Sequence, residues 1–190
     1  MIRSFLALCL LVVLGMPHAL AQQSQSYRPD SLQYLLKDST GQLFQLSFPT
    51  PSKKEFRFSA QPERLVLIDV WATWCKPCIE AQPKVDSLVK QVGADKVDVV
   101  YLSIDTEMEK WKNFTRKKKW KGTHILADKK LHTPIFDLLT FQYSSEKVRF
   151  FAVTIPQYFF INSSGQLLEA ASTDTPEFLN QMQNLAAEFE

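Results

Sequence analysis

The fold of this chain is decided by residues 65–78, which read LVLIDVWATWCKPC. The first seven of them are apolar except for Asp69, and such a run is typical of a strand buried on both faces of a parallel sheet. An apolar stripe with helical spacing then continues to Val92, ahead of Gly93, and predicts a helix over residues 75–92. Two cysteines therefore lie where a buried strand passes into a helix.

The rest of the chain predicts an α/β domain with one sheet flanked by helices. Alternation over residues 35–48, around Ser39-Thr40-Gly41, predicts an N-terminal hairpin, and residues 48–62 are expected to form a loop with at most a short edge strand. Strands are further predicted at residues 97–104, 123–127, 150–155, 157–162 and 166–168, and helices from a capping box at Thr106, at residues 131–139 and after Thr175. The order strand, helix, strand over residues 65–104 implies a right-handed crossover with a parallel strand pair.

The N-terminus is typical of a secretory signal. Residues 5–16 are an unbroken apolar run, and Ala19-Leu20-Ala21 offers small side chains where a signal peptidase cleaves. Twelve helical residues rise about 18 Å, which is short of the ~30 Å hydrocarbon core. We therefore expect a signal peptide over residues 1–21 cleaved after Ala21, a flexible arm over 22–34, a single domain over 35–190, and export to a periplasm; an uncleaved anchor is the alternative.

The charge of the chain favours neither nucleic acid nor an acidic partner. The 190 residues carry a formal net charge of +2. Residues 110–121 are dense in lysine and arginine and are interleaved with aromatic residues, but two glutamates precede them, so we interpret this segment as the solvated face of a helix.

Cysteine usage indicates redox chemistry. Loss of the signal, with Cys9, leaves only Cys75 and Cys78, and a pair this close in sequence closes too small a loop to add much stability. Zinc would need two further ligands, for which only His124 and His132 remain. We expect no metal and no cofactor other than the redox-active Cys75–Cys78 disulfide.

The position of the two cysteines predicts different roles for them. At a helix start, unpaired amides and the positive end of the dipole stabilise a thiolate at Cys75, with help from Lys76, so its pKa should fall below ~8.5. Cys78, one turn further, should be shielded from solvent. Cys75 is then the exposed nucleophile, and Cys78 resolves the mixed disulfide.

Three further residues are candidates for the site. Asp69 interrupts an apolar strand, and burial would raise its pKa and make it a proton acceptor for Cys78; the alternative is a solvated position at the strand edge. Trp74 and Pro77 flank the cysteines and would form an apolar rim that docks substrates, unless they only pack.

These residues resemble the thioredoxin superfamily and, within it, the TlpA/ResA-like reductases of bacterial envelopes. The resemblance runs over roughly residues 38–190, and it is carried by Asp69, the motif at residues 71–78, Pro83 and Thr154-Ile155-Pro156. It implies a thioredoxin-like three-layer α/β sandwich, with a mixed central β-sheet and helices on both faces. It also implies a cis Ile155–Pro156 bond that faces the cysteines and binds substrate, and a central insertion over residues 105–149.

Two positions depart from the family pattern. The family commonly has glutamate three residues after the second cysteine, where this chain has Ala81; Glu80 is rotated by about 100° from that place. Thioredoxins also carry a lysine near the buried aspartate, and the matching strand position here is Tyr101.

We therefore expect a monomeric reductase of disulfides in envelope proteins, supplied with electrons by a membrane thiol donor. Proline before the second cysteine is the thioredoxin-type arrangement and argues against a strong oxidant. A disulfide oxidase or isomerase is the alternative within the same chemistry. A non-catalytic binding module, such as a metallochaperone, is the alternative from another class.

Overall fold

A computed structural model describes residues 43–127, 140–145 and 148–190. The expected signal peptide (1–21) and arm (22–34) lie outside these residues, as do the turn expected at 39–41 and the helix expected at 131–139.

A five-stranded sheet forms the centre of the fold, in the order β5-β4-β3-β8-β9. Its strands are β3 (Leu65–Trp71), β4 (Val97–Ser103), β5 (Thr123–Leu126), β8 (Gln157–Ile161) and β9 (Leu167–Glu169). β3 is parallel to β4, and β4 to β5, whereas β8 runs antiparallel to both β3 and β9. All seven residues of β3 are buried, as expected for a strand covered on both faces. The predicted mixed sheet is confirmed.

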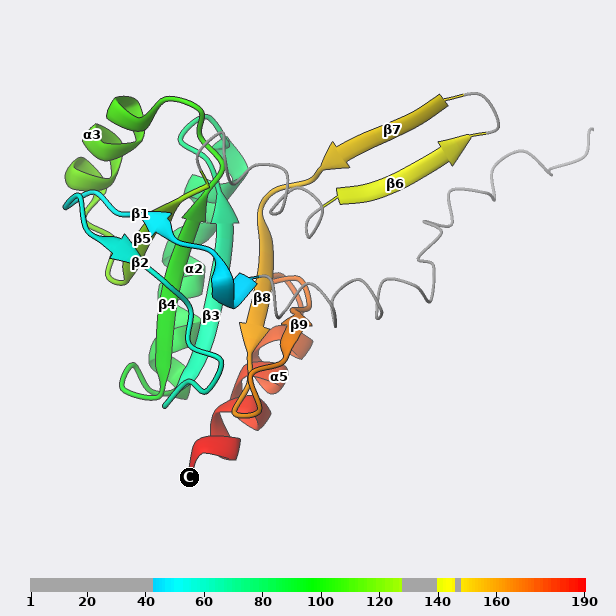
Figure 1. The fold of residues 1–190 in the computed structure, drawn as a ribbon. Coiled ribbons are helices and arrows are strands. Elements are labelled where there is room, and N and C mark those ends of the chain that lie inside the picture. Colours follow the sequence, from blue (N-terminus) through cyan, green and yellow to red (C-terminus); the bar gives the residue numbers. More distant parts are fainter. Residues whose placement is uncertain (1–42, 128–139, 146–147) are drawn as a thin grey trace, which may run out of the picture.

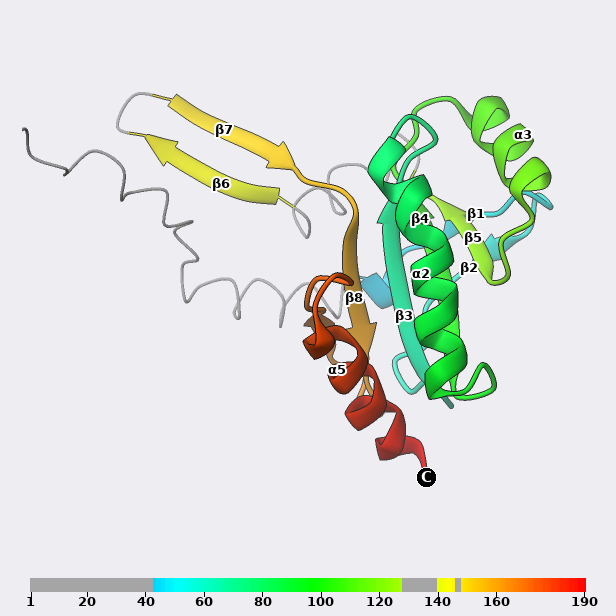
Figure 2. The same cartoon turned by 180° about the vertical axis from the view of Figure 1, so that it is seen from behind.

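Helices cover both faces of this sheet (Figures 1 and 2). They are α2 (Lys76–Val92), α3 (Met108–Lys118), α5 (Pro176–Ala186) and the short 3-10 helix η1 (Ala187–Phe189). Leu65 and Leu67 pack with residues of α2 and α5, whereas Ile68 and Val70 belong to the core that includes Trp111 of α3. Because side chains alternate along a strand, β3 supplies both cores. The three-layer α/β sandwich is therefore confirmed.

The α3 helix separates apolar from charged residues as expected. Trp111 is fully buried, whereas the lysines and arginine of its last turn are exposed. The predicted capping box is wrong: α3 begins at Met108, its N-cap is Glu107, and no side chain caps it. The backbone of Thr106 still belongs to the turn that leaves β4, so its hydroxyl is one residue too early to cap the helix.

The second arm of the predicted N-terminal hairpin is wrong, and its first arm lies outside the described residues; a short hairpin follows instead. β1 (Phe48–Pro49) pairs with β2 (Glu55–Phe56), and residues 43–45 form a helical turn instead of the second arm of a hairpin over 35–48. Thr50 closes the connection through bonds to Lys54. The rings of Phe48 and Phe56 both pack edge-on against Phe58, so aromatic packing sets the register.

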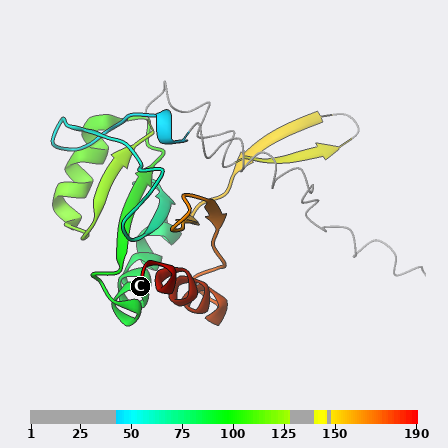
Figure 3. The same cartoon turned by 60° about the horizontal axis from the view of Figure 1, so that its bottom comes forward.

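The central insertion contains a hairpin that the sequence did not predict in full. β6 (Thr140–Ser145) pairs with β7 (Val148–Val153), and the two strands point away from the central sheet in Figures 1 and 3. β7 was predicted as a strand, β6 was not. The end of β7 leads within three residues to Pro156.

The chain end follows its turn and cap signals. Gly165 turns the chain between β8 and β9 with a φ of +73°, and a Cβ there would lie 2.1 Å from the carbonyl oxygen of Ala60. Only glycine fits such an approach in this conformation. α5 then starts as predicted, with Thr175 as its N-cap and Pro176 in its first turn.

Candidate active site

A tight turn between β3 and α2 holds the two cysteines. The amide of Cys75 donates to the carbonyl oxygen of Ala72 at 3.0 Å, and Cys75 is the N-cap of α2. A disulfide joins Cys75 to Cys78. The amide of Cys78 points at the sulfur of Cys75, 3.2 Å away. A helix amide therefore faces Cys75, as its place at the helix start predicts.

Cys75 is less accessible than predicted. Its exposed fraction is 5%, against 2% for Cys78, so Cys75 is the more exposed cysteine of the two, as expected. The prediction that Cys75 is open to solvent is wrong for this disulfide form. The reason is the loop after β7: the sulfur of Cys75 lies 3.8 Å from the carbonyl oxygen of Ile155.

The Ile155–Pro156 bond is cis, as the resemblance implies. It lies between β7 and β8, and the contact of Ile155 with Cys75 places it against the cysteine pair. Ile155 and Pro156 are half-buried, so part of each remains available beside the disulfide.

The two apolar residues that flank the cysteines in the sequence, Trp74 and Pro77, are both exposed. Trp74 is 62% exposed and is the only large hydrophobic side chain exposed within residues 43–127 and 154–190. Pro77 is exposed as well. Lys76 and Glu80 form an exposed ion pair at 3.6 Å, so Glu80 is turned towards solvent and does not take the place of the family's glutamate. Simple packing does not account for Trp74.

Asp69 is buried in the middle of β3, which excludes a solvated position. Burial raises its pKa to about 8. Its Oδ1 atom has no hydrogen-bond partner among the described residues. By strand alternation its side chain is on the face of the sheet shared by Leu65 and Leu67, which α2 covers. Asp69 thus lies under the helix that carries both cysteines.

Two tyrosines flank Asp69. Tyr101 of β4 and Tyr158 of β8 are both in register with it, on opposite sides. The Tyr101 hydroxyl accepts a hydrogen bond from Nε2 of Gln82 at 3.2 Å, and burial raises the pKa of Tyr101 to about 12. Burial also raises the pKa of Tyr158. Tyr101, the residue matched to the family's lysine position, is thus the neighbour of Asp69 on β4, whereas Tyr158 and Gln82 were not identified from the sequence.

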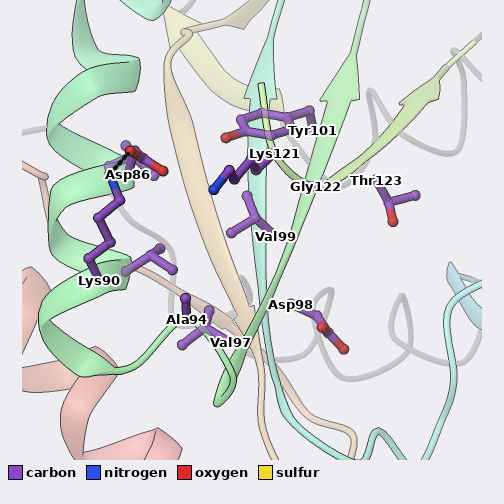
Figure 4. Close-up of a pocket in the computed structure, with 12 residues that line it drawn as sticks. Asp86, Lys90, Ala94, Val97, Asp98, Val99, Tyr101, Lys121, Gly122 and Thr123 are labelled. Atoms are coloured by element: carbon purple, nitrogen blue, oxygen red, sulfur yellow. Dashed lines mark hydrogen bonds and ion pairs between the residues drawn. The ribbon is translucent and has the colours of Figure 1, made fainter. Parts of the chain in front are cut away.

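Tyr101 also lines a hollow of about 260 Å³ that lies between α2 and the start of β5 (Figure 4). Tyr101 and Lys121 are close together at one end of it, and an ion pair of 2.5 Å between Asp86 and Lys90 lies at its side. Neither cysteine lines this hollow. It is separate from the cysteine site but shares Tyr101 with the surroundings of Asp69.

His124 packs against Tyr101. Its ring stacks on Tyr101 with 4.8 Å between centroids, its Nε2 lies 3.1 Å from the carbonyl oxygen of Trp120, and burial lowers its pKa. Within residues 43–127, 140–145 and 148–190, no group of three or more His, Cys, Asp or Glu side chains could hold a metal ion. The other candidate, His132, lies outside these residues.

The same described ranges contain no helix that is both long and apolar enough to span a membrane.

Comparison with known proteins gives a family and a fold. Residues 63–167, more than half of the chain, match a family model described as thioredoxin-like. A thioredoxin from Alicyclobacillus acidocaldarius is 34% identical over 65 residues, which are 34% of this chain and 61% of that protein. The chain therefore spans less than two thirds of the length of this relative.

Two solved structures share the fold. One is described as a thiol–disulfide oxidoreductase from Bacteroides vulgatus; it is 22% identical, with a TM-score of 0.60 over 75% of this chain and 86% of that one. The other is a secreted Mycobacterium tuberculosis disulfide oxidoreductase, 13% identical, with a TM-score of 0.52 over 77% of this chain and 97% of that one. The chain thus has the fold of thiol–disulfide oxidoreductases, with a Cys-x-x-Cys pair at the start of α2.

Proposed function

Because the chain belongs to the thioredoxin-like family, we propose that it is a thiol–disulfide reductase that acts on disulfides of exported proteins through Cys75 and Cys78. The observation that carries this proposal is the Cys75–Cys78 disulfide in the first turn of α2, against the cis Ile155–Pro156 bond. At this place the amide of Cys78 can stabilise a thiolate on Cys75. The backbone at Ile155 lies beside the same sulfur, where an extended substrate can bind along it.

The reaction is two exchanges of thiolate for disulfide. In the reduced protein, the thiolate of Cys75 attacks one sulfur of the substrate disulfide and releases the other as a thiolate. Cys78 loses its proton and attacks Cys75, which forms the Cys75–Cys78 disulfide and releases the second substrate sulfur. Two electrons pass to the substrate, whose sulfurs take up two protons, one originating from Cys78 and one from solvent.

Asp69 accepts the proton of Cys78 in this scheme. It is buried beneath α2 and has an unpartnered oxygen, and a pKa of about 8 is close to that of a thiol. A base and an acid of similar pKa exchange a proton in either direction at little cost. The same group can therefore serve reduction and reoxidation.

Substrates contact Trp74, Pro77, Ile155 and Pro156. Exposed aromatic rings are enriched at recognition surfaces, and Trp74 is exposed next to Cys75. The carbonyl oxygen of Ile155 lies beside the sulfur to which a substrate cysteine would be joined.

The cellular setting completes the proposal. Residues 1–21 direct export and are removed after Ala21, residues 22–34 form an arm, and residues 35–190 form a monomeric domain in a bacterial periplasm. A membrane thiol donor returns electrons to the Cys75–Cys78 disulfide, and no other cofactor or nucleic acid takes part.

The reduction potential of the cysteine pair tests the direction of electron flow. We expect a value between about −200 and −270 mV, the span of glutaredoxins and thioredoxin, because Pro77 precedes the second cysteine. Equilibration in glutathione buffers of known ratio, followed by alkylation and mass measurement, gives this value. A potential near about −120 mV would instead identify an oxidase.

A further inference from the structure

A second buried carboxylate lies just past the end of β4. Asp105 is 2% exposed, and it comes two residues after Ser103, the last residue of β4. β4 runs parallel to β3, so its end lies beside the turn that carries the cysteines. The amide of Ile104 also donates to the carbonyl oxygen of Trp71, which joins the two strand ends directly.

Three hydrogen bonds hold the Asp105 carboxylate, two from Thr73 of this turn and one from Ser103 at the end of β4. Its Oδ2 accepts from the amide of Thr73 at 2.9 Å and from the hydroxyl of Ser103 at 2.7 Å, and its Oδ1 accepts from the hydroxyl of Thr73 at 2.7 Å. Both oxygens are therefore partnered, in contrast to Asp69, whose Oδ1 has no partner among the described residues. These donors hold the Asp105 carboxylate in one place beside the turn.

Thr73, which donates two hydrogen bonds to the Asp105 carboxylate, is close to Cys75 along the chain. Thr73 precedes Cys75 by two residues, so at most about 7 Å of backbone separates their amides. The turn between them is closed by the bond from Cys75 to Ala72. Where water is partly excluded, a negative charge near the turn opposes formation of a second negative charge on Cys75 more strongly than it would in water.

We propose that Asp105 is a positioning residue with an electrostatic role: held by Thr73 and Ser103, it limits the stability of the Cys75 thiolate and so keeps the cysteine pair reducing. This inference rests on the proposed function. The Cys78 amide favours the thiolate and the Asp105 carboxylate disfavours it. Since a more stable thiolate makes the reduced form more stable, loss of the carboxylate should make the pair a stronger oxidant.

Asp105→Asn removes the charge and can keep the three bonds. The amide oxygen can accept from the Thr73 amide and the Ser103 hydroxyl, while the amide nitrogen donates to the Thr73 hydroxyl, which then acts as acceptor. The measurement is the rate at which iodoacetamide alkylates Cys75 in the reduced protein, as a function of pH. We expect its midpoint to fall by about one pH unit, and the equilibrium constant for oxidation by glutathione to fall about tenfold.

Two variants separate charge from geometry. Asp98→Asn makes the same change at an exposed position of β4 and should leave the midpoint unchanged. Thr73→Val removes one hydrogen bond and keeps the carboxylate, so it should leave the midpoint close to that of the wild type. If Asp105→Asn does not fold, Asp105→Ser, which also lacks the charge, should shift the midpoint in the same direction.

The result that overturns the inference is an unchanged midpoint in a folded, uncharged variant at position 105. An equal shift in Thr73→Val also overturns it, because geometry alone would then explain the change. Alkylation requires no substrate. If the wild-type protein failed to reduce a protein disulfide while the midpoint still shifted, the proposed function would fail and the role of Asp105 would stand.

Discussion

Replacement of Cys78 by serine should trap substrates on Cys75 as covalent mixed disulfides, whereas replacement of Cys75 should trap none and abolish activity. Cys75 is the N-cap of α2, faces the Cys78 amide and is beside the cis Ile155–Pro156 loop, so we expect it to make the first attack. Cys78 is 2% exposed and is joined to the sulfur of Cys75, so we expect it to act only on that sulfur. Non-reducing gels of each variant, incubated with a disulfide-bonded protein, measure the trapped species.

The double variant Cys75→Ser, Cys78→Ser is the control for non-covalent association. Iodoacetamide at mildly acidic pH should label Cys75 before Cys78 in the reduced wild type. Equal trapping by the two single variants would show that the assigned order of attack is wrong, and the argument from the helix start would be wrong with it.

Asp69→Asn should slow the resolution of mixed disulfides by about ten- to a hundredfold at neutral pH, because an amide cannot accept the proton of Cys78. In the wild type, the rate of resolution should rise with pH as Asp69, whose pKa is about 8, loses its proton. Single-turnover rates between pH 6 and 9 measure this. The exposed Asp95→Asn is the control and should behave as the wild type. Identical pH profiles for Asp69→Asn and the wild type would exclude Asp69 from the mechanism.

The same variant should be more stable than the wild type in alkaline solution. The pKa of Asp69 rises from 3.8 to about 8 on burial. Since the folded state then holds the proton more tightly than the unfolded state, this group stabilises the fold fully below its unfolded pKa and loses that contribution as pH rises towards 8. Asparagine has no such proton to lose. Urea unfolding at pH 5 and pH 9 should show a much larger difference at pH 9 than at pH 5, since the contribution is lost progressively between pH 3.8 and about 8.

The elements around the cysteines could be predicted because their signals are local. The apolar run of β3, the stripe and terminal Gly93 of α2, and the Thr175-Pro176 cap of α5 each act within a few residues. The turn at Gly165 is similar, since a positive φ demands glycine wherever the turn lies. The buried state of Asp69 could also be predicted, because its neighbours in sequence share the strand.

Features that depend on distant pairing could not be predicted. Tyr158 lies beside Asp69 only because β8 pairs with β3 in one register, and one residue of slippage would turn its ring to the other face. Two of the three hydrogen bonds of Asp105 come from Thr73, which is 32 positions away. The cover over Cys75 comes from Ile155, which is 80 positions away. No local pattern marks any of these contacts.

The central claim is that Cys75 and Cys78 exchange electrons with protein disulfides. In the most direct measurement, the reduced protein is mixed with insulin and the reaction is stopped at intervals by alkylation. Mass spectrometry then gives the number of alkylated thiols in each protein. We expect one Cys75–Cys78 disulfide to form for every two insulin thiols that appear, at the same rate. The Cys75→Ser variant should release no insulin thiols. Persistence of both cysteines as free thiols while insulin remains oxidised would contradict it.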